Sequence, residues 1–229
     1  MKMIGVYSYT VLLTYISLLS AGTGIVVSLS GNGHPYIGGL FLLICGLCDA
    51  FDGKVARSKK NRTELEKNFG IQIDSLCDIV AFGVLPACIG AALIKVADTD
   101  PSLKPMPQVA KVVIFAVLIL YILAAMIRLA YFNVTEEERQ KTEGGVRKYY
   151  VGLPVTSASI VFPTMLMLRY IFRTDVTVVY FVAAVFTGLA FISKLKIRKP
   201  GLKGILAWIL VGVVEFAVIT VFYFTESKI

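Results

Sequence analysis

The sequence has few of the residues from which most zinc and redox sites are built. It contains one histidine, His34, and four cysteines. Cys45 and Cys48 form a Cys-x-x-Cys pair, but no second pair accompanies it. We therefore expect the cysteines to be small buried residues and His34, which lies in a Gly/Pro-rich turn, to be a loop residue.

Long polar stretches are scarce as well. Of the 229 residues, 57% are hydrophobic, and the mean hydropathy is +0.77. Ordinary soluble domains are less apolar than this, and apolar runs of about 20 residues match the thickness of a bilayer. No soluble domain, internal repeat or cleavable signal peptide is recognisable, so we expect a single integral membrane domain over residues 1–229.

Seven apolar stretches predict an all-α bundle of transmembrane helices, with about six to eight spans as the range. The predicted helices cover residues 8–29, 36–57, 69–95, 109–133, 150–172, 175–193 and 204–224. The sixth stretch is short. We expect a catalytic core over residues 8–193, followed by an extra C-terminal helix.

The net charge of +8 comes largely from short loops between the apolar stretches. Basic residues are concentrated in residues 54–67, 139–148 and 194–203, and the alternate loops contain few. Since cytoplasmic loops are enriched in Lys and Arg, these three segments are predicted to face the cytoplasm. The N-terminus is then inside and the C-terminus outside. The membrane explains the basic residues, so no nucleic-acid partner is expected.

Four aspartates stand out in the second and third apolar stretches. Asp49 and Asp52 are three residues apart, and Asp74 and Asp78 are four apart, so each pair shares one helix face. Two adjacent antiparallel helices would bring all four carboxylates to one depth. A single aspartate in a transmembrane helix costs about 2.5–3.5 kcal/mol, and four together repel one another. Compensating cations are therefore expected.

Oxygen ligands select hard ions such as Mg²⁺, Mn²⁺ or Ca²⁺. Four carboxylates suit two ions about 3.5–4 Å apart, the arrangement used in in-line phosphoryl displacement. Two other interpretations stay open. The aspartates could pair with Lys54, Arg57 or nearby loop lysines. They could also form the ion site of a transporter, although they lie at a helix end and not between broken repeats at mid-depth.

Small residues accompany the aspartates. Gly53 and Ala56 give the second helix a narrow face where a ligand can approach the backbone, and Gly70 does the same on the third. Arg57 lies one turn after Gly53 and can pair with a ligand phosphate or with the carboxylates.

The pattern Asp49-x-x-Asp52-Gly53-x-x-Ala56-Arg57, followed by Gly70-x-x-x-Asp74-x-x-x-Asp78, resembles the signature of the CDP-alcohol phosphotransferases. The resemblance implies that the first three aspartates ligate metals, and that Asp78 is the general base and also contacts a metal. It also implies a set of CDP-lipid-binding residues: Thr14, Asp49, Gly53, Ala56, Arg57 and Gly70. The twelve residues between Arg57 and Gly70 exceed the usual family spacing by about one helical turn. We expect them to form a longer cytoplasmic loop.

Three further stretches, residues 69–87, 128–134 and 150–154, resemble the phosphatidylserine synthases of that family, with Tyr131 in place of an arginine. The first-helix segment 14–20 is similar too, with Ser17 in place of an asparagine. The resemblance implies transfer of a phosphatidyl group from CDP-diacylglycerol to L-serine with two divalent cations. It further implies a homodimer in the cytoplasmic membrane of a prokaryotic cell, with the site facing the cytoplasm. Glycerol 3-phosphate or inositol phosphate is the alternative acceptor.

Arg128 lies near the cytoplasmic end of an apolar helix. It either snorkels to the membrane interface or clamps an anion, such as a lipid phosphate or the carboxylate of serine. Asn133 would add an amide hydrogen bond to the same ligand.

The charge asymmetry generates a topology prediction. In intact cells, an impermeant thiol reagent should label an Asp98→Cys variant and spare a Lys199→Cys variant, and lysed cells should give labelling of both. The unsubstituted protein is the control for its own cysteines. Labelling of position 199 from outside would contradict the predicted orientation.

Overall fold

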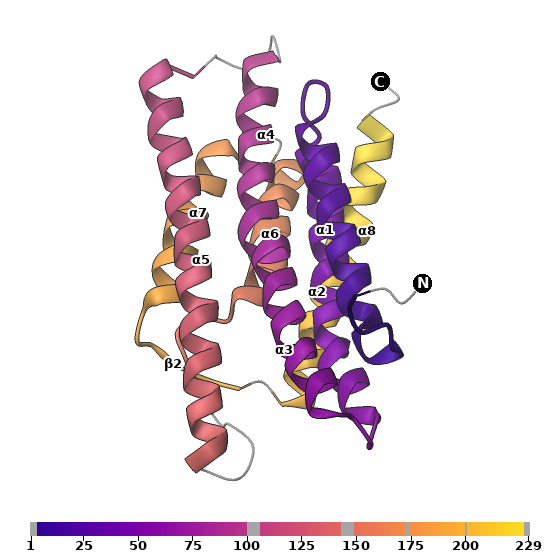
Figure 1. Ribbon diagram of the computed structural model, residues 1–229. Coiled ribbons are helices and arrows are strands. Elements are labelled where there is room, and N and C mark those ends of the chain that lie inside the picture. The colour runs from indigo at the N-terminus through magenta and orange to yellow at the C-terminus, as the bar shows by residue number, and fades with distance from the viewer. Residues whose placement is uncertain (1–3, 100–105, 143–148, 173–174, 200, 227–229) are drawn as a thin grey trace.

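The computed structural model describes residues 4–99, 106–142, 149–172, 175–199 and 201–226. They form an elongated bundle of helices lying roughly side by side (Figure 1). A short 3₁₀ turn at Tyr9–Val11 leads into α1 (Leu12–Leu29), which packs along α2 (Pro35–Ser58).

The third helical stretch is continuous but not uniform. α3 (Glu64–Asp78) passes through a π-helical segment, Ile79–Val84, into α4 (Leu85–Thr99). The remaining helices are α5 (Gln108–Thr142), α6 (Ala158–Phe172), α7 (Thr177–Ile192) and α8 (Leu202–Glu226).

Six helical stretches of the described chain are long and apolar enough to cross a membrane, and the short one is α7. The predicted all-α transmembrane bundle is confirmed, and the protein is an integral membrane protein.

Two helices extend further than their apolar stretches. α3 begins at Glu64, because Thr63 and Glu66 form a capping box in which each backbone N–H donates to the other's side chain, at 3.1 and 3.2 Å. Residues 64–69, expected in a loop, are therefore helical. α5 continues to Thr142, where ion pairs one turn apart, Glu136–Arg139 and Glu137–Lys141, support a polar helix.

The fifth predicted helix starts later than expected, and its first residues form a strand. β1 (Tyr149–Val151) pairs antiparallel with β2 (Lys196–Arg198), a small sheet that the sequence did not predict. Gly152 then turns with a φ of +78°, and Pro154 keeps the residue before it extended. The pairing joins the connection before α6 to the connection before α8.

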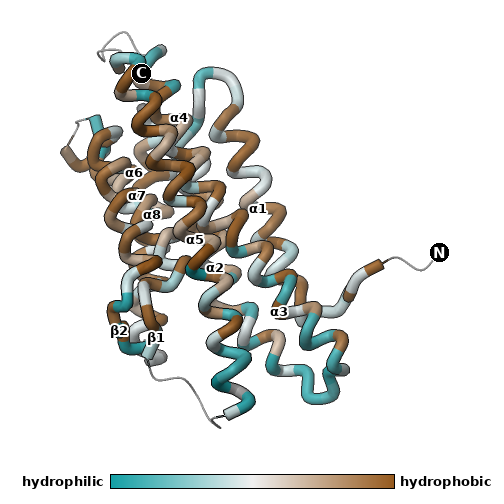
Figure 2. Tube along the Cα trace, turned by 60° about the vertical axis from the view of Figure 1, so that its left-hand side comes forward, coloured by the Kyte–Doolittle hydropathy of each residue, from teal (hydrophilic) through white to brown (hydrophobic). Residues whose placement is uncertain are grey.

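The basic segments gather at one end of the bundle. The α2–α3 junction, the far end of α5 and β2 all lie at the lower end in Figure 1, and Figure 2 shows hydrophilic residues concentrated at the ends of the helices. Residues 143–148 and 200 of these segments lie outside the described residues. At the opposite end, Lys111 Nζ and Asp98 Oδ2 form an ion pair at 2.6 Å. This arrangement fits the predicted topology, while the orientation in the membrane stays a prediction.

Two buried tyrosines donate hydrogen bonds to the backbone of the π-helical segment and of the start of α4. Pro86 has no N–H to donate to the carbonyl of Phe82 four residues earlier, and Tyr121 Oη donates to that carbonyl at 2.6 Å. Tyr180 Oη in turn donates to the carbonyl of Pro86 at 2.7 Å. α5 and α7 thereby fix the backbone that comes after Asp78.

Tyr121→Phe should lower the free energy of unfolding by about 0.5–1.5 kcal/mol, since it removes the hydrogen bond to the buried carbonyl of Phe82. The matched control is Tyr131→Phe on the same helix, because Tyr131 is 55% exposed. Thermal unfolding of the purified protein in detergent measures both. An equal effect of the two substitutions would contradict the role assigned to the Tyr121 hydroxyl.

Candidate active site

Four aspartates come together where α2 approaches the end of α3. All four are partly buried. The side chains of Asp52 and Asp74 share a hydrogen bond, and Asp78 interacts electrostatically with Asp49, Asp74 and Asp52. The i,i+3 and i,i+4 spacings on the two helices therefore yield one acidic cluster.

No basic side chain neutralises this cluster. Among the described residues, no ion pair joins any of the four aspartates to a lysine or arginine. Lys54 Nζ instead lies 5.5 Å from the centroid of the Phe51 ring. The guanidinium of Arg57 lies over Gly53, whose added Cβ would be 3.1 Å from Arg57 Nη1. The interpretation that the aspartates are paired with these cations is not supported.

The cluster has the chemistry of a site for hard cations. Two carboxyl groups can share a hydrogen bond only when one of them carries a proton, and a metal ion can take the place of that proton. The donor set is entirely oxygen. In the part of the chain that the structure describes, no three acidic, histidine or cysteine side chains converge closely enough to enclose an ion as they stand. Like charges repel, so carboxylates close in only around a cation. These residues fit divalent metal ions.

A cavity of about 740 Å³ opens along α2 beside the cluster. Charged side chains form part of its lining: Asp49, Asp52, Lys54, Arg57, Arg198 and Lys199. Apolar side chains of α8 form another part: Ile205, Trp208, Ile209, Val213 and Phe216. Asp74 and Asp78 are not part of the lining and connect to it through Asp52 and Asp49. The lining of the cavity thus combines charged and apolar side chains.

α1 packs behind the acidic cluster. Thr14 is buried, and its carbonyl accepts a hydrogen bond from Cys77 Sγ, between Asp74 and Asp78 in sequence, at 3.4 Å. Cys45 Sγ makes the same contact with the carbonyl of Ser17. All four cysteines are free, and all but the half-buried Cys88 are buried, which confirms the expectation of small buried residues.

A family model described as CDP-alcohol phosphatidyltransferase matches residues 9–211. The chain belongs to this family. The interpretation as a transporter is thereby set aside.

Relatives within the family are similar over most of this chain. It is 33% identical to the CDP-diacylglycerol–serine O-phosphatidyltransferase of Saccharomyces cerevisiae, over 81% of this chain and 70% of that protein. It is 31% identical to the archaetidylserine synthase of Methanothermobacter thermautotrophicus, over 67% and 56%. It is 27% identical to the CDP-diacylglycerol–serine O-phosphatidyltransferase of Helicobacter pylori, over 75% and 64%. The chain thus spans less than two thirds of the length of the last two.

Arg128, outside the family's aspartate signature, is only 5% exposed, so the interpretation that it snorkels to the interface is wrong. Its Nε donates to the carbonyl of Leu153 at 3.0 Å, and its guanidinium lies 5.3 Å from the Phe132 ring centroid. Leu153 lines the cavity, whereas Arg128 does not. Arg128 therefore contacts the cavity wall from behind, and a role as an anion clamp stays a prediction.

Asn133 also lies one step from the cavity. Its Nδ2 donates to Ser75 Oγ at 2.7 Å, next to Asp74 in sequence. This contact ties α5 to the helix that carries two of the family's aspartates. A direct contact of Asn133 with a ligand stays a prediction.

Three cavity residues were missed in the sequence. Arg198 and Lys199 contributed only to the topology prediction, and Tyr150 was assigned to a helix. The β1–β2 pairing brings them to the family's signature helix, with Lys199 Nζ 5.8 Å from the Tyr150 ring centroid. No local pattern marks such a pairing between distant segments.

Gly152 forms the turn directly after β1, which brings Tyr150 to the cavity. Its N–H donates to the carbonyl of Leu195 at 2.7 Å, and an added Cβ would lie 2.6 Å from the carbonyl oxygen of Phe191. At a φ of +78°, any other residue would also be strained.

Gly152→Ala should lower the free energy of unfolding by about 1–3 kcal/mol, the cost of a strained backbone conformation. Gly22→Ala on α1 is the control, because an added Cβ there meets nothing within 4 Å, and it should be neutral or stabilising by up to about 1 kcal/mol. Thermal unfolding in detergent compares them. A Gly152→Ala protein as stable as the control would refute the strain.

Proposed function

We propose that this protein transfers the phosphatidyl group of CDP-diacylglycerol to the hydroxyl of L-serine, giving phosphatidylserine and CMP. The observation that carries the proposal is the cavity whose lining combines charged side chains, among them Asp49 and Asp52, with apolar side chains of α8. A nucleotide joined to a diacylglycerol likewise has a charged part and an apolar part. The acceptor is supported by the relatives in yeast, an archaeon and a bacterium, whose names all specify serine products or substrates.

The donor fits the charges of the cavity. Arg57 and Arg198 offer planar guanidinium groups that can bind phosphate oxygens in pairs, and Lys54 and Lys199 add point charges. The acyl chains would lie along the apolar wall. Because α8 packs against α2 and α6, we assign it to the same domain as the catalytic core.

We assign the two divalent cations, Mg²⁺ or Mn²⁺, to Asp49, Asp52, Asp74 and Asp78. When bound, they would neutralise the negative charge of the pyrophosphate. The aspartates would hold the two ions beside the charged part of the cavity lining. Their convergence without a basic partner among the described residues supports the assignment.

Asp78 is the proposed general base. A serine hydroxyl is a weak nucleophile at neutral pH until a positioned group accepts its proton. As Asp78 takes the proton, the serine oxygen bonds to the phosphorus that carries diacylglycerol. The bond from that phosphorus to the bridging oxygen breaks, and CMP leaves. Asp78 lies one turn after Asp74 and interacts with Asp49 at the cavity, which supports this role.

The site is proposed to open to the cytoplasm, because the lysines and arginines around it belong to the segments that the positive-inside rule assigns to the cytoplasmic side. The homodimer and the prokaryotic cytoplasmic membrane rest on the family resemblance alone.

Asp78→Asn should reduce CMP release by about 10²-fold or more, the usual contribution of a general base. The variant should still be stabilised against heat by CDP-diacylglycerol with Mg²⁺, since the amide keeps the shape of the side chain. Asp98→Asn at the opposite end of the bundle is the matched control and should retain full activity. Normal turnover by Asp78→Asn would remove the assignment of the base.

The same assay tests metal and acceptor. EDTA should abolish CMP release by the unsubstituted protein, and Mg²⁺ or Mn²⁺ should restore it. L-serine should support release far better than glycerol 3-phosphate or inositol phosphate. Activity that survives exhaustive chelation would reject the metal role, and a preference for another alcohol would reject serine while keeping the donor.

A further inference from the structure

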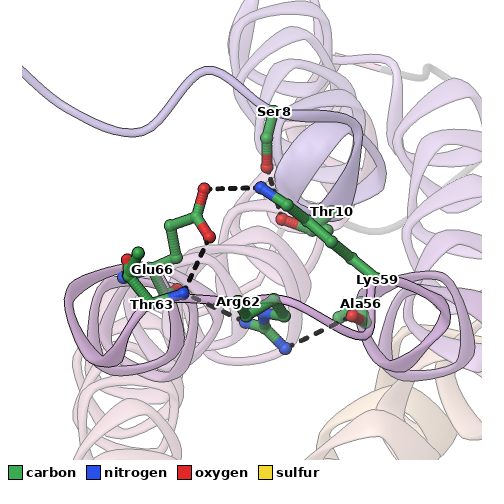
Figure 3. Close-up of polar contacts among 7 residues, drawn as sticks. All are labelled: Ser8, Thr10, Ala56, Lys59, Arg62, Thr63 and Glu66. Atoms are coloured by element: carbon green, nitrogen blue, oxygen red, sulfur yellow. Dashed lines mark hydrogen bonds and ion pairs between the residues drawn. The ribbon is translucent and has the colours of Figure 1, made fainter.

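Arg62 lies at the junction between the end of α2 and the start of α3, in the segment that is longer than usual for the family. Its side chain reaches between the two helices, as the close-up of this junction shows (Figure 3). Arg62 Nη1 donates to the carbonyl of Ala56 at 3.4 Å, and Nη2 donates to the carbonyl of Glu66 at 3.3 Å. One guanidinium thus bonds the backbones of both helices.

The contact with α2 uses a group that a helix end leaves unpaired. α2 ends at Ser58, so the carbonyl of Ala56 is one of the last four of the helix and has no partner within it. The planar guanidinium can donate in two directions at once, whereas an ammonium presents a single point of charge. Arg62 therefore caps α2 and attaches the cap to α3.

No acidic side chain among the described residues forms an ion pair with Arg62. The nearest carboxylate is already engaged, since Glu66 accepts from Lys59 Nζ at 2.6 Å and from the N–H of Thr63 at 3.1 Å (Figure 3). Arg62 Nε is buried with no hydrogen-bond partner in the described chain. The position of the guanidinium is set by the helix junction and not by a salt bridge.

Gly70 on α3 makes room for this guanidinium. A Cβ added at Gly70 would lie 2.8 Å from Arg62 Nη2, and no other described atom outside Gly70's own stretch of helix comes within 4 Å of it. Because the guanidinium is the end of a flexible side chain, an added Cβ would displace it from this position. From the sequence alone, Gly70 was expected to let a ligand approach the backbone of the helix.

We propose that Arg62 is a positioning residue that fixes α2 to α3 beside the acidic cluster, and that the absence of a side chain at Gly70 leaves its guanidinium room in this position. Asp52 precedes Ala56 by four residues, and Asp74 comes four residues after Gly70, so the contact lies about 6 Å along each helix axis from the Asp52–Asp74 pair. A metal site tolerates errors of only about 0.5 Å. The inference rests on the proposed role of these aspartates.

The test is a double-mutant cycle of Gly70→Ala, Arg62→Ala and the combined variant, in purified protein in detergent. The first readout is the melting temperature without metal, and the second is the Mg²⁺ concentration that gives half of the metal-dependent stabilisation. Each single substitution should lower the melting temperature and raise that concentration about tenfold, the usual effect of losing support behind metal ligands. Gly70→Ala should add nothing further in the Arg62→Ala background.

Arg62→Lys keeps the charge but not the planar fork, so it should behave like Arg62→Ala. Lys67→Ala is the control for loss of charge near the same junction, because Lys67 forms an ion pair with the exposed Glu64 and with no other acid of the described residues. It should match the unsubstituted protein. Gly22→Ala controls for the change from glycine to alanine in a helix.

Equal costs of Gly70→Ala in both backgrounds would overturn the proposal, and would return Gly70 to direct contact with a ligand. Rescue by Arg62→Lys, or an unchanged Mg²⁺ requirement in Arg62→Ala, would overturn the positioning role. Failure of the proposed function is seen separately. A preference for another alcohol would reject serine as the acceptor and would leave both readouts unaffected. A protein that Mg²⁺ does not stabilise would reject the metal site, and the melting temperatures of the cycle would still test the contact between Arg62 and Gly70.

Discussion

The mutual repulsion of four carboxylates within a membrane bundle is the constraint on which the rest of the site depends. Each of them loses hydration on entering the helices, and none gains a basic partner in the described chain. Neighbouring helices support the two helices that carry the aspartates. α1 packs behind the acids through Thr14 and Cys77, and Asn133 contacts their helix through Ser75. The result is an acidic cluster suited to cations and a phosphorylated ligand.

Much of this could be predicted from the sequence because it is local. A bilayer fixes the length of an apolar helix, so the hydrophobic stretches predicted the seven apolar helices. Their bounds agree within about five residues, except that α5 ends nine residues later and α6 begins eight residues later than expected. The spacing of Asp49 with Asp52, and of Asp74 with Asp78, placed each pair on one helix face. Because the two helices follow each other in the chain and are expected to be antiparallel, the two pairs of aspartates could be predicted to lie close together. The family resemblance agrees with both inferences.

The parts that sequence reasoning missed depend on contacts between distant segments. β1 and β2 have only three residues each, too few for a periodic pattern, and their pairing brings Arg198 and Lys199 to the cavity. The contact of Arg128 Nε with the carbonyl of Leu153, on the connection before α6, likewise joins distant segments. The early start of α3 was the exception, since Thr63 and Glu66 carry a recognisable capping pattern.

The π-helical segment after Asp78 sets the angular phase between the two halves of one long helix. In an unbroken α-helix, seven residues complete nearly two turns, so Asp78 would point in the same direction as Leu85, which is fully buried. A turn widened by one residue rotates α3 by about 100° relative to α4. The half that carries the aspartates can therefore face polar surroundings while α4 keeps its apolar face in the core. A sequence one residue shorter across Ile79–Val84 would have to give up one of these two orientations.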